Sequence, residues 1–167
     1  MRERMCRGWP AGAPFTVCGN GSLPANTKSI REWLPRACTR YGIKTVNDAG
    51  AGDLQWQDRI EWDVEYAPFD LFPRTDDVIE CDITAQTLPT VDATICRMVL
   101  NHLDKDRVTM ALDRLRDSSK YLFATHFAGG GVQRSAQFIR HDLTQWLGEP
   151  LEMCRDGTES NCFLALW

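Results

Sequence analysis

The fold of this chain is decided by residues 44–53, which read Lys-Thr-Val-Asn-Asp-Ala-Gly-Ala-Gly-Asp. A short run of β-forming residues, Ile43 to Val46, leads to an acid at Asp48, and two glycines then alternate with alanines. This pattern predicts a buried strand that breaks into a tight turn and continues as a helix. Residues without bulky side chains let the backbone of such a turn come close to a ligand. Taken alone, the motif also fits a surface loop that binds nothing.

A second acid supplies the context that a ligand-binding turn requires. Asp70 ends the next predicted strand, residues 64–70, and follows Asp48 by 22 positions. An acid at this spacing accepts hydrogen bonds from both hydroxyls of a ribose in nucleotide-binding α/β folds. The alternative, an exposed turn aspartate before Pro73, is the weaker interpretation. We therefore expect Asp48 and Asp70 on the same face of the molecule, in one site.

The composition predicts one globular domain. The chain has 167 residues, of which 43% are hydrophobic and 25% charged, enough to build a real core. A net charge of −4 argues against nucleic acid as the main partner, because neutralising phosphates needs clustered Lys and Arg. The nearest such cluster, Arg2, Arg4 and Arg7, lies in a terminus expected to be frayed. No apolar run approaches the roughly 18 residues of a membrane helix, and no secretion signal is visible, so we expect a cytoplasmic protein without a membrane partner.

The seven cysteines predict neither a metal site nor a disulfide framework. Their number is odd, and no Cys-x-x-Cys pair or Cys/His cluster has the spacing of a zinc site. We expect reduced, mostly buried thiols. A disulfide between Cys154 and Cys162, facing each other across a hairpin, is the less favoured alternative.

Gly and Pro punctuate the first 25 residues, which are predicted to be an arm or loop that precedes a single domain of residues 26–167. Asn26 or Thr27 caps the first predicted helix. Pro35 is expected to end that helix and to start another, which runs to Tyr41.

Further along the chain, predicted strands alternate with helices or short connections. The strands are 43–48, 64–70, 77–81, 91–97, 119–126, 151–155 and 162–167. The clearest helix is 105–117, capped by Asp104, and a shorter one is expected from Leu54 to Ile60. Such alternation predicts an α/β fold with a mostly parallel sheet, covered by helices on both faces. The stretches 71–76 and 83–90 are too short for crossover helices, so the sheet is expected to be trimmed on one side.

The C-terminal segment departs from this parallel pattern. The turn signal Asp156-Gly157 lies between two short strands and predicts a hairpin, so the last strand should run antiparallel.

At this point the sequence resembles class I S-adenosylmethionine-dependent methyltransferases, over roughly residues 19–167. Asp48-Ala49-Gly50-Ala51-Gly52 resembles the family's acid-x-Gly-x-Gly motif, and Asp70 falls at the position of the ribose-binding acid. Cys81-Asp82-Ile83 is similar to the segment beside the adenine, and residues 92–103 are similar to the fourth strand and its loop. The terminal hairpin matches the reversed last strand of this Rossmann-like, seven-stranded fold.

A narrower resemblance, to small methyltransferases of bacterial and phage-like genomes, lies in Gly19-Asn20-Gly21-Ser22, in Thr27 and Arg31, and in residues 118–125. It implies that Thr27 and Arg31 lie over the methionine end of the cofactor. The positions that the resemblance and the motif together assign to S-adenosyl-L-methionine are Thr27, Arg31, Asp48, Ala49, Gly50, Ala51, Gly52, Trp56, Asp70, Leu71, Asp82, Ile83, Cys96 and Arg97. For Trp56 a place in the core, and for Arg31 an exposed helix position, are open alternatives.

Two departures from the family pattern affect the expected cofactor site. Asp53 stands where many members have a third glycine, and Phe72-Pro73-Arg74 follows the second-strand acid where the family has a helix. The second departure leaves the wall around the ribose and adenine undefined.

Three side chains are candidates for catalysis. His126, which ends the predicted fifth strand, is a candidate general base. His102, in the loop after the fourth strand, either lines the pocket or fixes the loop. Arg97 meets an anionic substrate or pairs with a neighbouring acid. His141 is expected to be exposed, and the stretch from Gly129 to Pro150 is expected to be a lid or a plain connection.

Other cofactor classes fit less well. The Gly-x-Gly-x-x-Gly/Ala pattern of nicotinamide enzymes fails at Gln55, and the loop after the fourth strand has no Asn/Asp-Pro-Pro-aromatic motif of a DNA-base methyltransferase. We therefore expect methyl transfer to a small-molecule or peptide acceptor. The alternative is a protein that binds S-adenosylmethionine without transferase activity.

Overall fold

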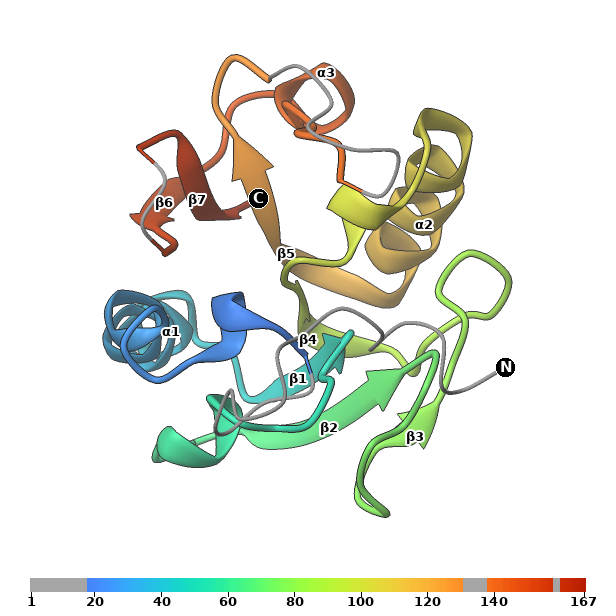
Figure 1. Cartoon of the computed structure of the whole chain (residues 1–167). Coiled ribbons are helices and arrows are strands. Elements are labelled where there is room, and N and C mark those ends of the chain that lie inside the picture. Colours follow the sequence, from blue (N-terminus) through green and yellow to red (C-terminus); the bar gives the residue numbers. More distant parts are fainter. Residues whose placement is uncertain (1–17, 131–137, 158–159) are drawn as a thin grey trace.

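The computed structural model describes residues 18–130, 138–157 and 160–167, and in these residues a single seven-stranded sheet forms the centre (Figure 1). The strand order is β3-β2-β1-β4-β5-β7-β6. The strands are β1 (Thr45–Ala49), β2 (Glu65–Asp70), β3 (Ile79–Glu80), β4 (Val91–Cys96), β5 (Ser119–Phe127), β6 (Glu152–Arg155) and β7 (Cys162–Leu166).

The predicted sheet is confirmed. All seven predicted strands form, and their ends lie within two residues of the expected positions. β1 lies between β2 and β4 and is parallel to both. β7 runs antiparallel to β5 and to β6, as the terminal hairpin predicted. The chain order reverses at β1 and β4, so the carboxyl ends of these strands form the edge where α/β folds bind ligands.

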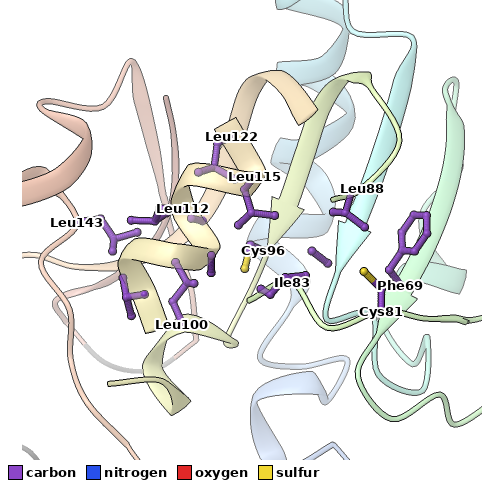
Figure 2. Close-up of a cluster of buried hydrophobic side chains, with 14 residues drawn as sticks. Phe69, Cys81, Ile83, Leu88, Cys96, Leu100, Leu112, Leu115, Leu122 and Leu143 are labelled. Atoms are coloured by element: carbon purple, nitrogen blue, oxygen red, sulfur yellow. The ribbon is translucent and has the colours of Figure 1, made fainter. Parts of the chain in front are cut away.

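Two helices cover opposite faces of the sheet (Figure 1). Helix α1 (Lys28–Tyr41) packs Ile30, Leu34 and Ala37 on one face, against side chains of β1, β4 and β5. Helix α2 (Lys105–Ser118) covers the other face, where Leu112 and Leu115 pack with Cys96 of β4 and Leu122 of β5 (Figure 2). The predicted cap of this helix is confirmed, since the Asp104 carboxylate accepts a hydrogen bond from the Arg107 amide at 3.0 Å.

The prediction that Pro35 divides the first helix was wrong. Residues 28–41 form one helix with Pro35 inside it, ended by Gly42 in a left-handed conformation. An interior proline costs about 3 kcal/mol. Fully burying a large aliphatic side chain gains about 1.5–3 kcal/mol, and Ile30 and Leu34 are both completely buried. Packing on the sheet therefore outweighs the lost hydrogen bond. Thr27 is the residue before the helix, but its hydroxyl makes no capping hydrogen bond.

The predicted helix from Leu54 to Ile60 was also wrong. Only a single 3-10 turn, η2 (Gln57–Arg59), forms there. Leu54 has a positive φ of 58°, which a right-handed helix cannot include. Within the predicted loop 127–150, the chain forms a short helix, α3 (Thr144–Leu147), that was not expected. Connections 71–78 and 81–90, both fully described, contain turns but no helix, as expected.

The remaining structural expectations are tested only where residues are described. None of the six described cysteines forms a disulfide, including Cys154 and Cys162. No described helix has the length and apolar character needed to cross a membrane. Residues 1–17 of the predicted arm, with Arg2, Arg4 and Arg7, and residues 131–137 of the predicted loop lie outside the described residues.

Candidate functional site

The glycine turn after β1 is tied to the end of β2. The amides of Gly50 and Ala51 both donate to the Phe69 carbonyl, at 2.7 and 3.0 Å. The Gly52 amide donates to the Asp70 carboxylate at 2.9 Å. Gly50 has a φ of +102°, and a Cβ added there would collide with the Val99 side chain of the loop after β4. The glycine is thus required both by backbone conformation and by the close approach of the β4 loop.

Asp48 is a buried carboxylate, and one of its two oxygens accepts no hydrogen bond from the described residues. Its Oδ2 accepts hydrogen bonds from Tyr66 Oη at 2.6 Å and from Gln57 Nε2 at 2.8 Å. Its Oδ1 has no hydrogen-bond partner among the described residues. Burial raises the pKa of Asp48 to about 6, against the lowering effect of the two donors. Burial and the nearby Asp48 also raise the pKa of Tyr66, which keeps its proton and remains a donor. An oxygen in this state is ready to accept from a cationic or hydroxyl group.

Asp70 lies at the same edge, partly exposed. Beyond Gly52, it accepts from the Phe72 amide at 2.9 Å through Oδ1. In the register of β1 and β2, Asp48 lies opposite Pro68, two residues before Asp70. Because side chains alternate along a strand, Asp48 and Asp70 lie on the same face, as expected. Asp82, two residues beyond β3, accepts from the amide and hydroxyl of Thr84, and the hydroxyl bond lowers its pKa.

The predicted positions Thr27 and Arg31 contact each other, and Thr27 is buried whereas Arg31 is partly exposed. The Arg31 side chain donates from Nε to the Thr27 hydroxyl at 3.3 Å and from Nη2 to the Pro24 carbonyl at 3.1 Å. The Thr27 hydroxyl in turn contacts the Leu23 carbonyl at 3.2 Å. Arg31 therefore braces the segment that leads into α1.

Arg97, one residue past β4, forms a buried ion pair. Its Nε and Nη2 donate to the two carboxylate oxygens of Asp156, at 2.9 and 2.8 Å. Its Nη2 also donates to the Gly21 carbonyl at 2.7 Å, and its guanidinium lies 5.4 Å from the ring centre of Trp56. The sequence left two roles open for Arg97, contact with an anionic substrate or pairing with a neighbouring acid. In the structure Arg97 pairs with an acid, Asp156.

The candidate histidines differ in their surroundings. His126 is buried, and its Nδ1 accepts from the Leu143 amide at 3.2 Å, so the proton of the neutral ring is on Nε2. His102 is exposed and contacts the Phe138 ring edge to face. The expectation that His141 is exposed was wrong, because its ring is buried and its Nε2 bonds the Leu103 carbonyl at 3.0 Å. A carbonyl can only accept, so Nε2 of His141 carries the proton and Nδ1 is left as an acceptor.

Several predicted cofactor positions contribute no side chain to the edge. Ala49, Ile83 and Cys96 belong to the core beneath α2, where Figure 2 shows Ile83 and Cys96 among the leucines. Trp56 belongs to the core beneath α1. Ala51 is buried, whereas Leu71, which follows Asp70, is exposed. At these buried positions only the backbone can face a ligand.

The sequence did not predict three residues that bond side chains of the candidate site: Gln57 and Tyr66, which bond Asp48, and Asp156, which bonds Arg97. Tyr66 occupies the position two residues before Pro68 on the face of Asp48, a relation readable once the β1–β2 register is known. Asp156 was noted only as a turn residue. Its partner Arg97 is 59 positions away, and no local pattern connects the two.

A separate open pocket of about 440 Å³ lies beyond the end of β5. Its walls are the start of α2 with Asp104 and Lys105, the Gly129-Gly130 turn, and the segment from Ile139 to Trp146. His141 and Trp146 line it and pack edge to face, 5.9 Å apart.

Comparisons with known proteins agree with this architecture. No protein-family model and no curated sequence matches the chain significantly. Among solved structures, magnesium protoporphyrin IX methyltransferase (ChlM) from Synechocystis PCC 6803 with bound SAM matches with a TM-score of 0.60 and 13% identity, over 87% of this chain and 78% of that chain. N-methyltransferase NodS from Bradyrhizobium japonicum WM9 matches with a TM-score of 0.61 and 14% identity, over 82% and 92%. The 1,6-didemethyltoxoflavin-N1-methyltransferase of Burkholderia thailandensis matches with a TM-score of 0.59 and 15% identity, over 88% and 77%.

These likenesses establish the fold. The chain has the Rossmann-like fold of class I S-adenosylmethionine-dependent methyltransferases, as the sequence motifs implied. Identities of 12–15% carry no residue-level correspondence, so the chemistry of the site has to come from the chain's own residues.

Proposed function

We propose that this protein binds S-adenosylmethionine at the carboxyl edge of β1, β2 and β4 and transfers its methyl group to a small-molecule acceptor. The observation that carries the proposal is the unpartnered Oδ1 of Asp48, nine-tenths or more buried beside the glycine turn. A buried carboxylate oxygen without a partner in the chain calls for a water, an ion or a ligand group that donates to it. A cofactor with a cationic ammonium group supplies such a group.

The residues at this edge fit the cofactor. Asp48 Oδ1 is available to the ammonium of the methionine end. Asp70, held in place by the Gly52 and Phe72 amides, keeps lone pairs on both oxygens for the two ribose hydroxyls. Asp82 and the Ile83 backbone lie two to three residues beyond β3, and the family resemblance assigns this segment to the adenine. The cofactor supplies an electrophilic methyl on a sulfonium, and the protein has to align the acceptor and exclude water.

The acceptor site that suits this arrangement is the pocket between α2 and α3. It opens at the end of β5, and its Trp146 wall and flanking charges suit a planar, polar small molecule. His141 brings an imidazole whose Nε2–H is fixed by the Leu103 carbonyl, which leaves Nδ1 to take a proton from a hydroxyl or amine. The neighbours ChlM and the toxoflavin enzyme are named for ring-containing small molecules. In its broader form, the proposal includes a peptide as the methyl acceptor.

The test has two stages. Calorimetry with S-adenosylmethionine and S-adenosylhomocysteine should show one site in the wild-type protein and greatly weakened binding in Asp48→Asn. Incubation with a panel of aromatic hydroxyl and amine compounds should then release S-adenosylhomocysteine, detected by mass spectrometry, and the Asp48→Asn variant should release none. Binding without release from any acceptor, small molecule or peptide, would favour a cofactor-binding protein without transferase activity. No binding at all would refute the proposal.

A further inference from the structure

The segment ahead of α1 crosses the candidate cofactor edge. We call residues 18–23 the strap; its central part is the 3-10 turn η1 (Asn20–Ser22). At one end, Cys18 lies against the turn after β1, since a Cβ added to Gly52 would be 2.7 Å from Cys18 Sγ. Further along, the Gly21 carbonyl accepts from Arg97 Nη2 at the end of β4. Because β1 and β4 are neighbouring strands, the strap spans the edge between them.

The strap's contact at β4 depends on a third segment. Arg97 is oriented by Asp156, which lies between β6 and β7 and binds the guanidinium through both oxygens. Both side chains are almost completely buried, at 3% and 0% exposure. Asp156 is itself held by its amide, which donates to the Cys162 carbonyl at 3.0 Å. The bidentate pairing with Asp156 therefore fixes the direction of Arg97 Nη2, which donates to the Gly21 carbonyl.

The Arg97–Asp156 pair lies close to Asp48, so it bears on the candidate cofactor site as well as on the stability of the fold. Gly52, which Cys18 contacts, donates to Asp70, and Gly50 of the same turn abuts the Val99 side chain two residues past Arg97. Arg97 is also close enough to Asp48 for its positive charge to lower the pKa of that acid. The strap thus lies between the two segments that border the unpartnered Asp48 oxygen.

We propose that Arg97 and Asp156 are a positioning pair that fastens the strap across the edge of β1 and β4, so that the strap encloses the methionine end of the bound cofactor. This inference rests on the proposed function, because it names S-adenosylmethionine as the occupant. It assigns Arg97 no contact with the reacting atoms. Its effect on cofactor affinity acts through the Gly21 carbonyl.

The test uses a variant that frees the strap without leaving a buried charge. Arg97→Met/Asp156→Leu replaces both partners by apolar side chains, a change that proteins often tolerate, whereas single substitutions leave an uncompensated charge. Arg97→Lys keeps the positive charge near Asp48 but loses the two-pronged geometry. The control is Glu152→Gln, which disturbs the ion pair between Glu152 of the same hairpin and Arg40 of α1 without touching the strap.

Two readouts are measured on each full-length variant. Hydrogen exchange of the amides in residues 18–27 should become faster in the double variant, while β1, β4 and β5 stay protected. Affinity for S-adenosylhomocysteine should fall by about ten- to a hundredfold, the range expected when a charge-assisted hydrogen bond is lost. Arg97→Lys should show the same two changes to a smaller degree, and Glu152→Gln should show neither.

The outcomes separate the inference from the proposed function. Unchanged affinity in a folded double variant with fast strap exchange would overturn the positioning role and leave cofactor binding intact. Wild-type affinity in Arg97→Lys, with its strap exchanging fast, would show that charge rather than the strap matters, and would overturn the inference as well. A wild-type protein that binds no cofactor would overturn the proposed function, and the inference with it.

Discussion

Among the described residues two aspartates are buried, and the two carboxylates are in opposite states. Asp156, between β6 and β7, has both oxygens bound by the Arg97 guanidinium. Asp48, near the end of β1, has two neutral donors on one oxygen and no partner on the other among the described residues. Both are only 1% exposed, so burial does not distinguish them.

Under the proposed function, the difference separates a structural acid from an acid that binds a ligand. A buried charge that is fully paired contributes to the native state only while its partner is present. A buried carboxylate with a free oxygen raises the free energy of the empty protein, and a bound cation or donor recovers that cost. The folded chain tolerates the second state at Asp48, next to the glycine turn and Asp70.

The largest expected effect is on stability, at Asp156. Asp156→Ala leaves the Arg97 guanidinium buried without its counterion, and the free energy of unfolding should fall by about 3–5 kcal/mol. Urea unfolding measures this change. The matched control is Glu32→Gln, which breaks the exposed pair of Glu32 with Arg36, whose side chains are 55% and 70% exposed; it should cost about 0.5 kcal/mol or less. Equal effects of the two substitutions would remove the distinction between a buried and an exposed pair.

The next effect is on binding, at Asp70. In Asp70→Ala, each lost hydrogen bond from a ribose hydroxyl to the carboxylate should cost about 1.5–3 kcal/mol, or about ten- to a hundredfold in affinity. Calorimetry with S-adenosylhomocysteine checks this, and circular dichroism checks that the fold is retained. Asp77→Ala, an exposed acid in the connection after β2, is the control and should bind normally. Undiminished affinity in Asp70→Ala would place the ribose elsewhere.

The sequence predicted the sheet and the two acids of the candidate site, because both depend on local patterns. Each strand is a short β-forming run, and Asp48 and Asp70 each follow such a run at the carboxyl end. The sequence did not predict the pairing of Arg97 with Asp156, since contacts between residues 59 positions apart arise only from the folded topology.

The local errors have physical causes of the same kind. Pro35 is a poor helix residue, and tertiary packing of Ile30 and Leu34 overrides it. Residues after the glycine turn have helix-compatible composition, yet Leu54 adopts a positive φ and the Gln57 side chain turns back to Asp48. His141 was expected to be exposed because it lies in the 127–150 segment, whereas its ring is buried and bonds the Leu103 carbonyl.

A third prediction uses pH to show that Asp48 is costly when ionised. Burial raises its pKa from the ordinary 3.8 to about 6. Between these two values the folded chain binds the proton and the unfolded chain does not, so the free energy of unfolding contributed by Asp48 falls as the pH rises toward 6 and stays low above it. Asp48→Asn, whose amide oxygen can accept the same two hydrogen bonds, should therefore be more stable than wild type by at most about 3 kcal/mol at pH 8.

The advantage of Asp48→Asn should vanish near pH 4, and the variant should lose cofactor binding throughout. Thermal unfolding across this pH range, with calorimetry at pH 8, measures both effects. A variant that is less stable than wild type at pH 8 would mean that the Asp48 charge is satisfied after all, like that of Asp156.

The smallest effect concerns His126, a buried group whose hydrogen bond is satisfied. Burial lowers the pKa of His126 below its ordinary 6.5, against the opposing charges of Asp142 and Glu149. The unfolded chain then takes up this proton more readily, so His126 makes the fold less stable as the pH falls through 6.5, the opposite sign to Asp48. Protonation also puts a hydrogen on Nδ1, which now accepts from the Leu143 amide. In His126→Gln, whose side-chain oxygen can accept from the same amide, the loss on acidification should be smaller than in wild type. Thermal unfolding of Asp48→Asn with and without His126→Gln isolates this slope, and a loss just as steep without the imidazole would assign it to another group.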